Sequence, residues 1–103
     1  MGASDWDRMK AAVPIGSKVS GRVTACAPFG VFVDLGLGFP GLLELPEFAD
    51  AAPRPQGVTR LPAVGDQLSA WVLQHVDDNR QLRLTQRALT AEQWEQIRGF
   101  RGA

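Results

Sequence analysis

Two phenylalanines three residues apart are the side chains of this sequence best suited to holding a planar ligand. Phe29 and Phe32 belong to the run Pro28–Leu35, in which Val31 and Val33 alternate with Phe32. Because successive strand side chains point to opposite faces, inward valines would leave Phe32 outward, with Phe29 beside it after a glycine bend. Two neighbouring aromatic faces can stack unpaired nucleic-acid bases. The alternative is that one ring packs beneath a terminal helix, and the pattern alone favours neither.

Charged residues are unevenly distributed, although the 11 basic and 11 acidic side chains give a net charge of zero. Residues 1–27 and 79–103 are mainly basic, whereas residues 28–78 are mainly acidic. The first and last strands of a closed barrel can be neighbours, so the basic ends could form one patch. Arg22, expected to point outward on the strand before Phe29, would then contact phosphate. The alternative is ordinary solvated charge with no partner.

Catalytic and metal-binding chemistry has little support in the residue types. The chain has one histidine, His75, and one cysteine, Cys26, so it offers neither a zinc-ligand set nor a recognisable triad. The glycines of residues 36–41 lie between expected strands, which indicates a turn rather than a dinucleotide-binding loop. The adjacent Asp77 and Asp78 also fit a turn. We expect no catalytic residue, no metal and no cofactor.

The location of the protein follows from what the sequence carries at its N-terminus and in its apolar runs. A single cysteine fits a reducing compartment. No apolar run approaches the roughly 20 residues that a membrane helix needs, and residues 1–7 do not resemble a signal peptide. We expect a cytoplasmic protein without membrane association.

Alternating and turn-forming residues predict five short strands with a helix at each end. The expected strands are residues 18–27, 31–35, 42–45, 67–76 and 81–85. Five short strands without a βαβ rhythm indicate an all-β fold, a five-stranded antiparallel barrel with short N- and C-terminal helices. We expect an N-terminal helical extension over residues 1–14, the barrel over 15–88 and a C-terminal helix over 89–103.

The order and spacing of these motifs resemble the S1-type RNA-binding domain, a family with the oligonucleotide-binding (OB) fold. The matching residues are Gly16, Val19, Gly21 and Val23, then Phe29 to Leu35, Gly41 to Leu43, Val64 to Asp66, Val72, Val76, Asp77 and Leu82 to Thr85. The resemblance covers about residues 15 to 87. It implies an OB-type barrel that binds single-stranded RNA through its second and third strands.

The resemblance also implies which residues touch RNA. The stacking aromatics of the family correspond to Phe29 and Phe32, and its acidic residue after strand four corresponds to Asp77. Its basic residue at the start of strand five falls on Gln81, so neighbouring arginines would take that part. The expected RNA-binding residues are Phe29, Phe32, Arg22, Glu44, Asp77, Arg80 and Arg83.

One departure from the family keeps two functions open. After Gly-Leu-Leu the family usually carries histidine and, two residues later, serine, where this chain has Glu44 and Pro46. A carboxylate repels phosphate, so we expect Glu44→Gln to tighten RNA binding. The first hypothesis is non-catalytic binding of single-stranded RNA by an aromatic and basic barrel face. The second is a protein-interaction module with weak or lost RNA binding, suggested by Glu44, the acidic middle and the apolar Phe32 and Trp71.

Overall fold

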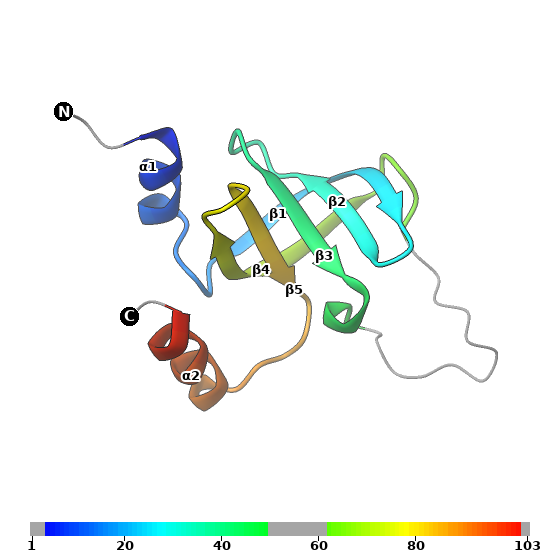
Figure 1. Cartoon of the computed structure of the whole chain (residues 1–103). Coiled ribbons are helices and arrows are strands. Elements are labelled where there is room, and N and C mark those ends of the chain that lie inside the picture. Colours follow the sequence, from blue (N-terminus) through cyan, green and yellow to red (C-terminus); the bar gives the residue numbers. More distant parts are fainter. Residues whose placement is uncertain (1–3, 50–61, 102–103) are drawn as a thin grey trace.

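The computed structural model describes residues 4–49 and 62–101, which form a β-barrel with a helix before it and another after it (Figure 1). The elements are α1 (Asp5–Ala12), β1 (Lys18–Ala27), β2 (Gly30–Asp34), β3 (Pro40–Glu44), the 3-10 turn η1 (Leu45–Glu47), β4 (Gln67–Val76), β5 (Gln81–Thr85) and α2 (Ala91–Arg101). Three of the five strands have the predicted bounds, and the other two begin one or two residues earlier than expected.

The five strands close in the order β1-β2-β3-β5-β4, with β4 returning to β1. The predicted five-stranded barrel is confirmed, but one pairing differs from the all-antiparallel expectation. β3 and β5 run parallel, with Gly41 opposite Leu82 and Leu43 opposite Leu84. Strand directions cannot alternate all the way around a closed ring with an odd number of members, so one pair must be parallel. The barrel is therefore mixed.

The barrel interior is filled by inward-facing side chains from every strand. Its fully buried members are Leu43, Leu82, Leu84, Val23, Val31, Val33 and Val72, and Thr85 at the end of β5 is also fully buried. Val31 and Val33 are 0% and 1% exposed, whereas Phe32 between them is half-buried. The predicted alternation of β2 is confirmed, and it turns the ring of Phe32 to the outer surface.

Helix α1 packs against the barrel through its apolar side chains. Ser4 caps the helix by accepting a hydrogen bond from the backbone N–H of Asp7. Trp6 and Met9 are buried and belong to the same apolar cluster as the barrel interior. The indole of Trp6 meets the ring of Phe39 edge-on, with centroids 4.9 Å apart. This helix therefore extends the core at the end of the barrel where β4 turns into β5 (Figure 1).

Helix α2 begins with a capping box formed by Thr90 and Gln93. The backbone N–H of Thr90 donates to Oε1 of Gln93 (2.8 Å), and the backbone N–H of Gln93 donates to Oγ1 of Thr90 (3.1 Å). The helix approaches the turn before β1, where a Cβ added at Gly16 would lie 2.6 Å from Nη2 of Arg98. Among the described residues, no helix has the length and apolar character needed to span a membrane.

Candidate nucleic-acid interface

Strand register brings three outward side chains into one row across β2, β3 and β5. Phe32 lies opposite Leu42, and Leu42 lies opposite Arg83. Leu42 is only 4% exposed, yet it is not part of the interior apolar cluster. An outward leucine flanked by a phenyl ring and an arginine stem can be buried by those neighbours. The row therefore combines an apolar floor with a guanidinium group at one side.

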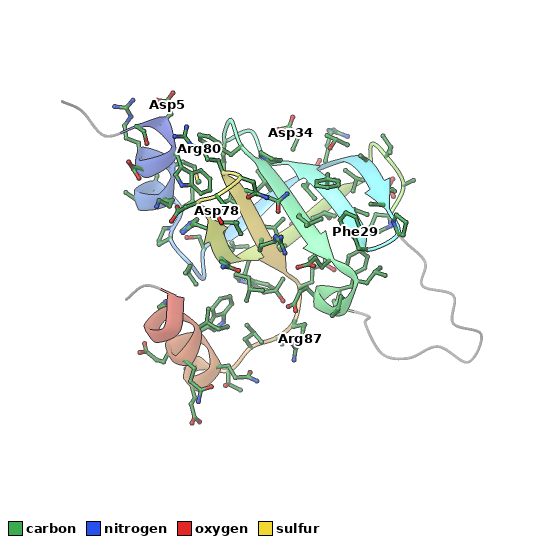
Figure 2. The ribbon with its side chains drawn as sticks, in the orientation of Figure 1. Asp5, Phe29, Asp34, Asp78, Arg80 and Arg87 are labelled. Carbon is green, nitrogen blue, oxygen red and sulfur yellow. The ribbon has the colours of Figure 1, made fainter. Side chains whose placement is uncertain are left out.

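Phe29 joins this row from the bend between β1 and β2. Its ring centroid lies 6.0 Å from that of Phe32, with the rings at 86° to each other. The side chain of Phe29 is 51% exposed, and Figure 2 shows it at the end of the barrel far from α1. This edge-to-face arrangement is a favourable aromatic geometry and leaves aromatic surface accessible to a ligand.

Gly30 allows the two phenylalanines to meet. A Cβ at this position would lie 2.3 Å from the carbonyl oxygen of Leu43 and 2.8 Å from Cα of Glu44. The backbone N–H of Leu45 also donates to the carbonyl oxygen of Phe29 (2.9 Å). The end of β3 thus approaches the bend too closely for any side chain at position 30, and this contact fixes where Phe29 lies.

A short polar network borders the aromatic pair. One Nη1–H of Arg83 donates to Oε1 of Glu44 (2.7 Å), and its Nε–H donates to Oε1 of Gln81 (2.8 Å). The side chains of Arg83 and Glu44 are 30% and 41% exposed, so the ion pair is partly screened by water. Glu44 offsets part of the positive charge that Arg83 would otherwise present to a phosphate.

Arg22 lies farther along the same outer surface. It is opposite Asp34 on β2 and Gln67 on β4, and its Nη1–H donates to the carbonyl oxygen of Gly65 (3.1 Å). Phe32 is instead opposite Ala25, because the register shifts between Val23 and Ala25. Arg22 is therefore an exposed cation at the margin of the row rather than a member of it.

Asp77 lies at the junction of the barrel and α1, away from the aromatic pair. Its Oδ1 accepts hydrogen bonds from Nε1 of Trp6 (2.7 Å) and Nζ of Lys10 (2.8 Å). The hydrogen bond from Lys10, followed by that from Trp6, holds the pKa of the Asp77 carboxyl below its ordinary value. The same contact raises the pKa of Lys10. Asp77 thus fastens the helix to the barrel.

Arg80 shares this location in the turn between β4 and β5, where its φ is 50°. Figure 2 shows Arg80 and Asp78 beside α1, with Phe29 on the other side of the barrel. Of the residues expected to touch RNA, the structure brings together Phe29, Phe32, Glu44 and Arg83, places Arg22 nearby, and separates Asp77 and Arg80 from them. Leu42 and Gln81 also belong to this surface, and the residue types did not single them out.

These features together define a class of protein. A closed five-stranded barrel with an exposed aromatic pair beside a guanidinium is typical of OB-type domains that bind single-stranded nucleic acid. Among the residues that the structure describes, no group of three or more histidine, cysteine or acidic side chains could hold a metal ion.

The family model described as S1 RNA binding domain matches residues 12–87. The chain belongs to this family, and RNA binding is the activity that membership implies. It is 33% identical over 81 residues to the small ribosomal subunit protein bS1 of Chlamydia muridarum, an alignment that covers 78% of this chain and 14% of that protein. The bS1 protein of Pseudomonas aeruginosa is 28% identical over 95 residues, which are 92% of this chain and 17% of that protein. The chain thus spans 14% to 17% of the length of these curated relatives.

Solved structures support the same fold. GSP13 from Bacillus subtilis superposes with a TM-score of 0.57 at 27% identity, over 72% of this chain and 55% of that chain. RNase R of Mycoplasma genitalium superposes with a TM-score of 0.59 at 21% identity, over 79% of this chain and 14% of that chain. At this identity the second similarity concerns the barrel fold alone.

Proposed function

We propose that the chain binds single-stranded RNA without catalysing a reaction, through the outer surface formed by Phe29, Phe32, Leu42, Glu44 and Arg83. We call this surface the aromatic face. The observation that carries the proposal is the edge-to-face pair of Phe29 and Phe32, with Phe29 half exposed, directly beside the row that leads to Arg83. Stacking of a base on an aromatic ring contributes roughly 1–3 kcal/mol.

The chemistry of the aromatic face favours unpaired strands over duplexes. Bases must leave a helix before their flat surfaces can reach Phe29 and Phe32, and single strands meet that condition without loss of pairing. Arg83 would contact the backbone with the N–H donors not used by Gln81 and Glu44. Arg22, at the margin, would add a phosphate contact whose strength falls with salt.

A titration of the isotopically labelled chain with an oligouridine of about eight nucleotides tests this proposal. Backbone amide shifts should concentrate at residues 29–32, 42–44 and 81–83, while those of α1 should stay unchanged. An RNA duplex of the same length is the control and should bind more weakly at equal salt. Shifts confined to α1 or α2, or no shifts at all, would exclude the aromatic face as an RNA site.

A protein-binding surface is the second candidate function. The pairing of Arg83 with Glu44 reduces the net positive charge of the aromatic face, while Phe32 and Leu42 keep its centre apolar. Interfaces between proteins favour aromatic and arginine side chains in such surroundings. Affinity for oligouridine that shows no dependence on salt and no loss on substitution of Phe32 would favour this candidate.

A further inference from the structure

Glu44 places a carboxylate within the aromatic face, where a bound base would present its edge. Glu44 lies opposite Gly30, the residue that follows Phe29 in the chain. The residue before Glu44, Leu43, lies opposite Val31. Because residue 30 has no side chain, nothing from that position separates Glu44 from the bend that carries Phe29. A base stacked on Phe29 or Phe32 would therefore have this carboxylate at its edge.

The carboxylate is held in position rather than free to swing away. Arg83 binds its Oε1 at 2.7 Å, and Arg83 is itself held by Gln81 at 2.8 Å. An arginine fixed on two sides limits the rotamers of its partner. The carboxylate still has capacity for further hydrogen bonds, since two oxygens offer about four acceptor positions. At 41% exposure, the side chain of Glu44 is open to a ligand.

We infer that Glu44 makes the aromatic face selective for guanine among the four RNA bases, an inference that rests on the RNA binding proposed above. Guanine is the base whose Watson–Crick edge offers two adjacent donors, N1–H and the N2 amino group, which match the two oxygens of a carboxylate. Adenine and cytosine each place an acceptor nitrogen beside their amino group, and uracil flanks N3–H with two carbonyl oxygens. A fixed carboxylate therefore attracts guanine and is repelled by part of the edge of each other base.

Arg83 completes the match. The third group on the guanine edge is the acceptor O6, beside N1–H, and Arg83 has N–H donors beyond those given to Glu44 and Gln81. The pair of Glu44 and Arg83 thus presents acceptors next to donors, the order that the guanine edge requires. The carboxylate also repels the phosphates of any bound strand. A strand with guanine at this position offsets that repulsion through its two donors, N1–H and the N2 amino group, whereas strands with other bases bind more weakly.

The test uses the full chain and fluorescence anisotropy with labelled oligouridines of about eight nucleotides that differ at one central base. The base is uracil, guanine, adenine, cytosine or hypoxanthine, which resembles guanine but lacks the N2 amino group. Guanine should bind about tenfold more tightly than uracil, and hypoxanthine should fall between them. Equal affinity for all five strands would overturn the inference and leave the proposed function intact. Failure of every strand to bind would overturn both.

Glu44→Gln provides the decisive variant. The amide can still accept from Arg83, but its NH₂ group now opposes the donors of guanine, so the preference should shrink to about twofold or less. Affinity for the all-uridine strand should rise at low salt, because a negative charge near phosphate is gone. Asp78→Asn makes the same change of charge in the turn beside α1 and should keep the guanine preference. A variant Glu44→Gln that folds with an unchanged melting temperature and keeps the preference would contradict the inference.

Discussion

Phe32 lies on the outside of β2 between Ala25 and Leu42, while its sequence neighbours are buried in the barrel. Phe32→Ala should therefore weaken oligouridine binding by about 1–3 kcal/mol through lost stacking. Folding should change little, because the ring contributes mainly to the surface. Isothermal titration and a thermal melt measure the two effects on the same sample. Loss of folding without a specific loss of affinity would mean that the ring is part of the core.

Val33→Ala should lower the stability of the fold and leave RNA affinity unchanged, the reverse of the effects expected for Phe32→Ala. Val33 is 1% exposed and packs inside the barrel, so removing two methyl groups should lower the free energy of unfolding by about 1–3 kcal/mol. Affinity for oligouridine should be retained at temperatures where the variant is folded. Denaturant unfolding gives the stability, and a midpoint unchanged from that of the original chain would contradict the burial assigned to this residue.

At the scale of elements, the contact between β2 and β3 at Gly30 controls the aromatic pair. Gly30→Ala would force a methyl group against the carbonyl oxygen of Leu43, so the strands must separate at this point. We expect a loss of stability of about 1–3 kcal/mol and weaker RNA binding, because Phe29 would move away from Phe32. Thermal melts and the oligouridine titration check both effects. An alanine variant with normal stability and affinity would show that the close approach is not required.

Local patterns predicted the elements well for a physical reason. Alternation in β1 and β4, and the capping box at Thr90, depend on residues close together in sequence, so their signals can be recognised without the fold. Phe29 and Phe32 are also close in sequence, but the position of Phe29 depends in addition on the contact of the bend with the end of β3. That one pair must be parallel could have been predicted from the odd strand number, since a closed ring of five cannot alternate throughout, but which pair it is depends on the strand order.

Contacts between distant segments were not predictable in the same way. Glu44 and Arg83 pair only because β3 and β5 meet in one particular register, which the sequence pattern does not specify. Asp77 follows β4 at the place where the family has its acidic residue. Its carboxylate, however, accepts hydrogen bonds from Trp6 and Lys10 of α1, which are far from it in sequence. A match to a family motif therefore predicts the residue type at a position more reliably than it predicts which residues contact it.

At the scale of the whole molecule, docking of α1 should depend on pH through Asp77. The pKa of Asp77 is lowered from its ordinary value of 3.8, so its stabilising contact is fully present above that value and is lost as the pH falls through the lower, folded-state pKa. The pKa of Lys10 is raised from 10.5. The stabilisation that its contact with Asp77 provides is therefore fully present below 10.5 and is lost as the pH rises through the higher, folded-state pKa. Protection of the Trp6 indole N–H against hydrogen exchange, measured relative to a free indole at the same pH, should therefore fall at both extremes.

Asp77→Asn isolates this effect from the titration of other groups. The variant should expose the Trp6 indole to exchange even near neutral pH and should lose the acid-side response that the original chain shows. Its affinity for oligouridine should match that of the original chain, because Asp77 contacts α1 and its chain neighbour Asp78 lies on the other side of the barrel from Phe29 (Figure 2). If the variant keeps α1 docked but loses RNA affinity markedly, Asp77 takes part in RNA binding after all.

The closed ring also sets the order in which the aromatic face can be assembled as the chain folds. Phe29 and Phe32 are near neighbours that meet once β1, β2 and β3 have paired, whereas Gly41 and Leu82, partners in the β3–β5 pairing, are about forty residues apart. Contacts of long sequence separation form late, because loop closure opposes them. A partly folded chain would thus carry the stacking surface before Arg83 reaches Glu44. The chain would therefore be able to stack bases before it could discriminate between them, because discrimination requires the β3–β5 pairing that closes the barrel.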